Sequence, residues 1–215
     1  MADRTGLSTA GATQIWFADD WIVVAEKPAD LLAVPGRGEA GREHFWGRVQ
    51  AAYPDALVVH RLDMATSGLI VMARGPESQR RLNRAFAERQ VHKTYHALVE
   101  GCVGDDQGTI SVPLICDWPN RPRQIVDRQR GKPALTHWRV LQRLARHTRL
   151  ALEPVTGRSH QLRVHLQSIG HPICGDTLYN PDAAACTRLT LHAAELSFGH
   201  PDTGQPCHFM SPVPF

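Results

Sequence analysis

Two short apolar runs set the strongest limit on how this chain can fold. Residues 21–25 (Trp-Ile-Val-Val-Ala) and 69–73 (Leu-Ile-Val-Met-Ala) are apolar at every position. A run of this length between turn-forming residues is typical of a buried strand, and the first run ends at Lys27-Pro28, where proline stops strand pairing. A membrane helix needs about 20 apolar residues, so both runs are expected in the core of a soluble protein.

The other segments alternate between helical and strand periodicity. Helical spacing is found over residues 43–53, after Pro76, and over about ten residues that start at Ser159, the expected N-cap, and end at Gly170. Strand alternation covers residues 91–99, 138–144 and 148–153, and the last two are expected to form a hairpin. Together these segments predict an α+β fold with a mixed, mostly antiparallel sheet and flanking helices.

The chain length favours a single domain. The 215 residues, of which 42% are hydrophobic and 21% charged, are enough for one sizeable core. Residues 1–13 are small and polar without periodicity and are expected to form a loose leader, which leaves 14–215 as one domain. The N-terminus lacks a charged-then-apolar signal pattern. We therefore expect a cytoplasmic monomer.

Cysteine and histidine spacing favours neither disulfides nor metal. The five cysteines form no Cys-x-x-Cys pair and are odd in number, so reduced thiols are expected. His160, His165 and His171 lack the i, i+4 spacing that places two imidazoles on one helical face. The chain has no Walker loop, and no nucleotide cofactor is expected.

Positive charge is concentrated in one part of the chain. The segment from Arg121 to Arg163 holds 11 Lys or Arg residues and only two acidic ones, Asp127 and Glu153. The rest of the chain holds 13 basic and 19 acidic residues. A basic face on an acidic body is typical of a nucleic-acid-binding protein.

Asp63 is the candidate for chemistry. It lies between His60-Arg61 and the turn Thr66-Ser67-Gly68, on a loop that the second apolar run anchors. The neighbouring basic residues favour the ionised carboxylate, which suits a nucleophile or a base. The alternative is that Asp63 only hydrogen-bonds its own turn, as aspartate often does.

Residues 60–63 (His-Arg-Leu-Asp) with 66–69 (Thr-Ser-Gly-Leu) resemble the signature of the RluA-type pseudouridine synthases. Further matches cover nearly the whole chain: Lys27-Pro28, 93–97, 157–165, 170–173, 175–176 and 191–193. The resemblance implies the pseudouridine synthase fold and a cofactor-free isomerisation of uridine in RNA. The reaction breaks the bond from N1 to the ribose, turns the base over and joins the sugar to C5, so the base must be flipped out of its stack.

The resemblance also implies roles for three residues. The aspartate that matches Asp63 initiates the reaction, for which covalent addition and a glycal route have both been proposed. The tyrosine that matches Tyr95 contacts the target uracil and has been considered a proton acceptor. The arginine that matches Arg163 pairs with the aspartate and keeps it charged.

Several further residues are expected to bind RNA. Arg61 is expected either to contact phosphate or to stack where the flipped base had been. Residues 117–130 form a proline-rich, basic segment, predicted to be a long surface loop. The expected RNA-binding residues are Arg61, Trp118, Arg121, Arg123, Lys132, Arg158 and His160.

The family resemblance also bears on the substrate. Many relatives carry an N-terminal S4-type RNA-binding domain, for which the residues before the first strand leave no room, so recognition is expected from the catalytic domain itself. Residues 117–122 resemble the loop of members that modify both 23S ribosomal RNA and the anticodon stem-loop of tRNA. A single ribosomal target is the alternative.

Two other classes of function remain open from the sequence. A nucleosidase or glycosidase also uses an aspartate at a sugar carbon but usually needs two flanking carboxylates, and the motifs supply one. A non-catalytic RNA-binding protein would not need Asp63. Product analysis separates the three classes, because a hydrolase releases free uracil, an isomerase forms pseudouridine and a binding protein forms neither.

Overall fold

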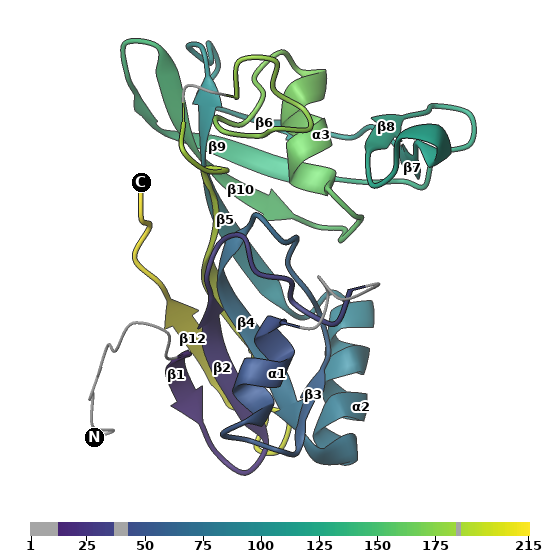
Figure 1. Ribbon diagram of the computed structural model, residues 1–215, viewed down its shortest axis with the longest axis vertical. Coiled ribbons are helices and arrows are strands. Elements are labelled where there is room, and N and C mark those ends of the chain that lie inside the picture. Colours follow the sequence, from purple (N-terminus) through teal and green to yellow (C-terminus); the bar gives the residue numbers. More distant parts are fainter. Residues whose placement is uncertain (1–12, 37–42, 184–185) are drawn as a thin grey trace.

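The computed structural model describes residues 13–36, 43–183 and 186–215 (Figure 1). The predicted leader, residues 1–13, lies outside the described residues except for its last position. The strands are β1 (Gln14–Ala18), β2 (Ile22–Lys27), β3 (Ala56–Val58), β4 (Ser67–Arg74), β5 (His92–Glu100), β6 (Gln107–Ile110), β7 (Leu114–Cys116), β8 (Gln124–Val126), β9 (Thr136–Arg143), β10 (His147–Pro154), β11 (Leu191–Gly199) and β12 (Pro206–Met210). The helices are α1 (Phe45–Gln50), α2 (Gly75–Ala87), the 3-10 helix η2 (Trp118–Asn120) and α3 (Gln161–Ser168).

One large sheet runs through the molecule. Its strand order is β1-β2-β4-β11-β5-β10-β9-β6, with β3 attached to β4 and β12 attached to β11. The pairs are antiparallel except for β4 and β11, which run parallel. In Figure 1 the strands β5 and β11 connect an end that carries α1 and α2 with an end that carries α3. The predicted α+β class with a mixed, mostly antiparallel sheet is confirmed.

Both faces of the sheet are covered, which explains the two apolar runs. In β2, Val23 and Ala25 point to a core that includes Phe45 of α1 and Leu166 of α3. The alternate residues of β2 point to a second core that includes Leu82 of α2. Successive side chains of a strand face opposite sides, so a strand between two cores is apolar at every position.

The third helix differs from its prediction at the start. Its N-cap is His160 rather than Ser159, and no side chain caps the helix. The His160 backbone is in the left-handed region with φ 52°, which directs its imidazole toward the side chains described below instead of the helix end. Ile169 is 38% exposed because the helix ends one residue before it. Gly170 follows with φ 82°, as predicted.

The segment 117–130 is more ordered than the predicted surface loop. It contains η2, and β8 pairs with β7 in a separate two-stranded sheet that projects to one side of the body (Figure 1). The backbone N–H of Gln124 donates to the hydroxyl of Tyr179 at 2.8 Å, which ties this hairpin to the segment after α3. The segment lies at the surface as predicted, but β8 was not predicted because a strand of three residues is too short for alternation to be recognised.

No helix in the described part of the chain is long and apolar enough to cross a membrane.

Candidate active site

The loop that carries Asp63 is fixed by a close backbone contact. Gly68, at the start of β4, pairs with Ala193 of β11 and has φ 116°. A Cβ at this position would lie 2.4 Å from the Ala193 carbonyl oxygen, so only glycine fits. Beside it, the Ser67 hydroxyl and the His192 Nδ1 are 2.8 Å apart. The short loop before β4 is therefore held against the centre of the sheet.

A buried lysine anchors the same loop from the other side. The Lys27 side chain is fully buried, and its ammonium donates to the carbonyl oxygens of Pro28, Leu31 and Met64 at 2.7, 2.8 and 2.8 Å. Burial lowers the pKa of Lys27 to about 7, although the carboxylates of Asp30 and Asp63 oppose the shift. Because Met64 follows Asp63 directly, Lys27 positions the backbone at the catalytic candidate. The sequence matched Lys27-Pro28 to the family but indicated no such contact.

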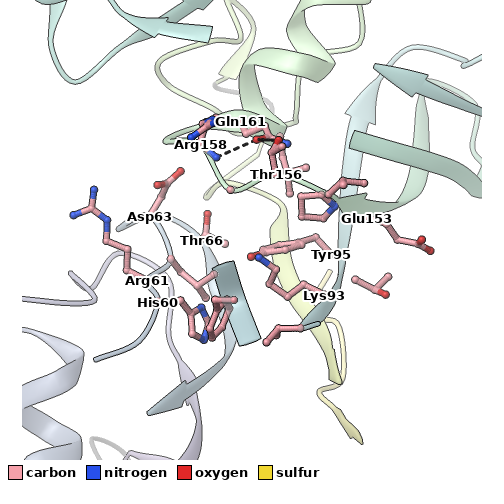
Figure 2. A pocket seen from close by; sticks show the side chains of 18 of the residues that line it. His60, Arg61, Asp63, Thr66, Lys93, Tyr95, Glu153, Thr156, Arg158 and Gln161 are labelled. Atoms are coloured by element: carbon pink, nitrogen blue, oxygen red, sulfur yellow. Dashed lines mark hydrogen bonds between the residues drawn. The ribbon is translucent and has the colours of Figure 1, made fainter. Parts of the chain in front are cut away.

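Asp63, Tyr95 and Arg163 line one cavity of about 720 Å³. Figure 2 shows Asp63 on its loop at one side of the cavity and Tyr95, with Lys93, on β5 at the other. Three predicted RNA-binding residues, Arg61, Arg158 and His160, line the same cavity. Residues that lie up to 102 positions apart in the chain therefore meet as the sequence predicted.

Arg163 is held by a partner that the sequence did not identify. The residue is 4% exposed, and its Nε and Nη2 each donate to a carboxylate oxygen of Asp176 at 2.7 Å. The remaining nitrogen, Nη1, lies 3.6 Å from Oδ2 of Asp63. Burial alone would lower the pKa of Arg163, but the carboxylates of Asp176 and Asp63 raise it overall. The fork with Asp176 thus fixes the direction in which Arg163 faces Asp63.

His160 lies between Asp63 and Tyr179, a second residue that was not predicted from the sequence. Its Nε2 lies 4.0 Å from Oδ2 of Asp63, and its Nδ1 lies 2.6 Å from the hydroxyl of Tyr179. Burial lowers the pKa of His160 although Asp63 opposes the shift, so the imidazole is neutral at pH 7. The Tyr179 ring also packs 5.0 Å from the guanidinium of Arg163. Residues 175–176 matched the family signature but suggested no role for Asp176, and no sequence signal marked Tyr179.

The environment of Tyr95 argues against a role as base. Burial is the main cause that raises the pKa of its hydroxyl, and the charge of Asp63 raises it further. The hydroxyl therefore stays protonated at neutral pH and can donate a hydrogen bond. Its ring lies at the cavity wall, where an extruded base can stack.

A second groove of about 480 Å³ adjoins the Asp63 loop. It shares Arg61, Asp63 and His160 with the first cavity and is also lined by Trp118 and Arg121 of the β7–β8 hairpin. Trp118 is 65% exposed, and the guanidinium of Arg121 lies 4.7 Å from the centre of its ring. These exposed groups offer a stacking surface and a cation next to the catalytic loop.

The remaining RNA-binding candidates are placed differently. Arg123 lies over the Tyr179 ring at 5.6 Å, and Arg158 lines the first cavity while its Nε donates to the carbonyl oxygen of Pro133. Lys132 is exposed and pairs by its backbone with Leu114. Lys132 lines neither of the two cavities, so the structure does not bring it together with the others.

We expect the protein to lose stability in mild acid because of two histidines behind the Asp63 loop. Burial and the charge of Lys93 lower the pKa of His60 to about 3, and burial with Arg188 and His96 lowers that of His192 to about 4. His60 also accepts the Val71 N–H at Nε2, which requires the neutral ring. Between these values and about 6.5 the unfolded chain binds more protons, so the free energy of unfolding falls as pH falls.

The size of this effect is measurable. Each of the two histidines should lower the free energy of unfolding by about 1–2 kcal/mol at pH 5 relative to pH 7. Denaturant unfolding at pH 7, 6 and 5 measures it, and a His60→Gln variant should show a shallower pH dependence. A wild-type free energy that is constant over this range would contradict the prediction.

Comparison with known proteins places this site in a family. The model of the family described as RNA pseudouridylate synthase matches residues 21–168, and the chain belongs to that family. The predictions of an isomerase and of RNA modification are thereby confirmed, with RNA as the partner.

Individual relatives match over most of their length. The chain is 51% identical over 196 residues to the "Dual-specificity RNA pseudouridine synthase RluA" of Vibrio vulnificus (strain CMCP6), with 88% of this chain and 78% of the relative covered. Its identity to the protein of the same name from Escherichia coli (strain K12) is 48% over 204 residues, covering 94% and 93%. Among solved structures, "Human RNA Pseudouridylate Synthase Domain Containing 1" has a TM-score of 0.81 at 27% identity, covering 98% of this chain and 87% of that one.

Proposed function

We propose that this enzyme isomerises uridines in two RNAs, 23S ribosomal RNA and the anticodon stem-loop of tRNA. The support is that about half of the aligned residues are identical to those of several enzymes named as dual-specificity. These matches cover most of this chain and most of each relative. The family match over residues 21–168 includes the segment after Asp117, whose hairpin borders the groove beside the Asp63 loop. The protein acts as a cytoplasmic monomer whose catalytic domain, residues 14–215, recognises RNA.

The observation that carries the chemistry is the meeting of Asp63, Arg163 and Tyr95 in one cavity. The extruded uridine enters this cavity and its base stacks on the ring of Tyr95. Asp63, which Nη1 of Arg163 faces at 3.6 Å, starts the reaction. The bond from N1 to C1′ of the ribose breaks, C5 bonds to C1′, C5 loses its proton and N1 gains one. The atoms balance without an oxidant, a nucleotide or a metal, so no cofactor takes part.

Recognition is expected to use the shape of a short stem-loop. The exposed Trp118 and Arg121 form a sequence-tolerant contact surface, and proteins that bind RNA loops read splayed bases and the phosphate path. A small domain of this kind can accept two RNAs if both present the same bent loop.

The experiment that tests dual specificity begins in cells that lack this protein. Pseudouridine is mapped in total RNA, and synthetic stem-loops that contain each lost site are treated with the purified enzyme. Loss of one site in 23S RNA and of sites in tRNA, with modification of both stem-loops, is the expected result. Loss at one site only would show that the enzyme has a single ribosomal target. Release of free uracil would show that it is a hydrolase and not an isomerase.

We expect Arg121→Ala to weaken RNA binding and leave turnover at saturating RNA unchanged. Removing one phosphate contact should lower affinity several-fold and reduce the slope of log affinity against log salt by about 0.7–0.9. Arg128→Ala is the matched control, since Arg128 is exposed in the same segment but lines neither cavity. An equal loss in both variants would show that general charge, and not this groove, binds the RNA.

A further inference from the structure

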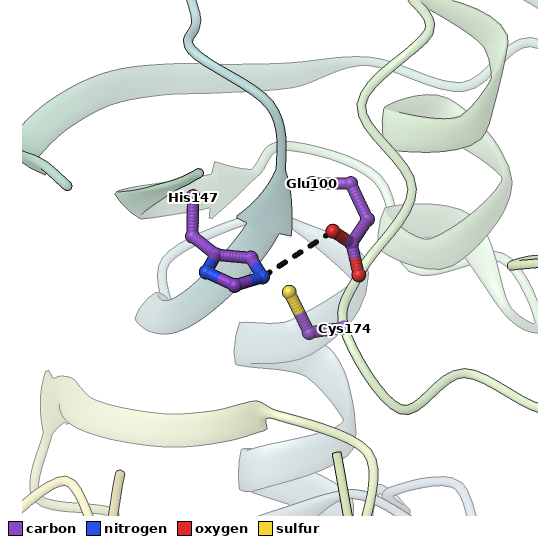
Figure 3. A group of neighbouring side chains, drawn as sticks. All are labelled: Glu100, His147 and Cys174. Atoms are coloured by element: carbon purple, nitrogen blue, oxygen red, sulfur yellow. Dashed lines mark ion pairs between the residues drawn. The ribbon is translucent and has the colours of Figure 1, made fainter. Parts of the chain in front are cut away.

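A second cluster of reactive side chains lies away from the catalytic cavity. Glu100, His147 and Cys174 each present one ligand atom, and these atoms all lie within 4.8 Å of one another (Figure 3). Nε2 of His147 is 3.3 Å from Oε2 of Glu100. Glu100 ends β5, His147 begins β10 and Cys174 lies in the segment that follows α3. The three side chains thus converge from three separate parts of the fold.

Main-chain hydrogen bonds fix all three positions before any ion binds. Glu100 and His147 are direct partners in the β5–β10 register. The N–H of Cys174 donates to the Leu98 carbonyl oxygen, and the N–H of Glu100 donates to the Pro172 carbonyl oxygen, both at 2.9 Å. The Asn180 amide donates to Oε1 of Glu100 at 3.2 Å, which orients the carboxylate and leaves Oε2 facing the histidine. Such support around the ligands is typical of metal sites.

The chemistry of the donor set points to one kind of cation. A thiolate, an imidazole and a carboxylate together suit zinc, whereas calcium and magnesium prefer oxygen alone. Zinc binds these donors at about 2.0–2.3 Å in a tetrahedron, whose ligand atoms are then separated by about 3.3–3.8 Å. The 3.3 Å between the imidazole and the carboxylate has this size. Cys186 is not one of the three clustered residues, but its Cβ lies 3.1 Å from where a Cβ at Gly175, the residue after Cys174, would stand, so a further thiol is near the cluster.

We propose that Glu100, His147 and Cys174 bind a structural zinc ion, with Cys186 as the fourth ligand. This inference departs from the metal-free protein that the sequence predicts, because the ligands are far apart in the chain and form no local motif. It concerns a site at the C-terminal end of β5, five residues beyond Tyr95, and it does not depend on the proposed substrates.

The ion would join elements that position the active site. It would link β5 to β10 and both to the segment that carries Cys174. Asp176 follows Cys174 by two residues and holds Arg163 through its two 2.7 Å contacts. Zinc is therefore expected to stabilise the fold and to keep the Arg163 guanidinium directed at Asp63, while taking no part in the chemistry itself.

The test uses the full-length protein, reduced and freed of metal with a chelator. Titration with zinc alone in a calorimeter should give one ion per chain, and zinc should raise the melting temperature by about 5 °C or more at a large excess over Kd. Cobalt should give a thiolate charge-transfer band and the visible bands of a tetrahedral site. Absence of stoichiometric zinc binding, or a cobalt complex without the thiolate band, would overturn the proposal.

Variants assign the ligands. Cys174→Ser, His147→Gln and Glu100→Gln should each lower zinc affinity by at least about 100-fold, since even residues that only orient ligands cost about 10–100-fold. The side chains of His147 and Glu100 are partly exposed, so their replacement is expected to leave the fold intact. These two variants therefore test zinc binding even if the Cys174 variant does not fold.

Two controls match the cluster. Cys207→Ser removes a thiol elsewhere, and His208→Gln breaks a second histidine–glutamate pair, with Glu195, that has the same 3.3 Å separation. Both controls should bind zinc like the wild type. Affinity that falls equally in the controls and in the ligand variants would show that zinc binds non-specifically, and the proposal would be wrong.

Discussion

Replacement of Asp63 by Asn is expected to lower pseudouridine formation at least about 10³-fold, as loss of an initiating group does in other enzymes. The amide keeps the shape of the carboxylate but cannot act as nucleophile or base. RNA affinity should stay within about threefold of wild type, because phosphate contacts supply most of it. Single-turnover assays on a stem-loop and a binding titration measure the two quantities separately.

Glu153 provides the comparison for this variant, because it also lines the cavity. A hydrolase of the two-carboxylate kind would need both residues, whereas the isomerase needs only Asp63. Glu153→Gln should therefore retain turnover with pseudouridine as product. Retained turnover in Asp63→Asn, or equal loss in the two variants, would remove Asp63 from its assigned role.

The buried pair of Arg163 and Asp176 gives the second large effect. Asp176→Asn should lower the free energy of unfolding by about 3–5 kcal/mol, because it leaves a buried guanidinium without its partner charge. Turnover should also fall, since Arg163 loses the fork that directs its Nη1 toward Asp63. Denaturant unfolding and single-turnover rates measure the two effects.

A double variant separates stability from positioning. Arg163→Met with Asp176→Leu removes both charges together and should recover most of the lost stability, as replacement of buried ion pairs by apolar residues often does. Activity should not recover, because no guanidinium then faces Asp63. Full activity in the stable double variant would show that the pair serves only the fold.

The parts of the fold that sequence predicted are those with local patterns. The apolar run at 69–73 identified the strand behind Asp63, and the alternation over 91–99 identified β5, which carries Tyr95. The short strand β8 and the start of α3 were missed or misplaced, because three residues show no period and the left-handed His160 leaves no compositional trace.

The sequence predicted those site residues that lie in recognisable motifs. Asp63 and Arg163 do face each other, but the contacts that fix them join distant segments. Lys27 reaches the Met64 carbonyl, and Tyr179 reaches His160, only after the sheet has formed. Neither backbone carbonyls nor a single tyrosine carries a signal in sequence, so these contacts emerge only in three dimensions.

The parallel pairing of β4 with β11 has a consequence for the order in which the protein is made. Gly68, which fixes the Asp63 loop, docks on Ala193, and Ser67 contacts both His192 and Arg188. A chain that emerges from the ribosome from its N-terminus exposes Asp63 early but receives the partners of Ser67 only after 121 to 125 further residues have been made. The nascent chain therefore holds an unfinished candidate active site until β11 has been made and can pair with β4.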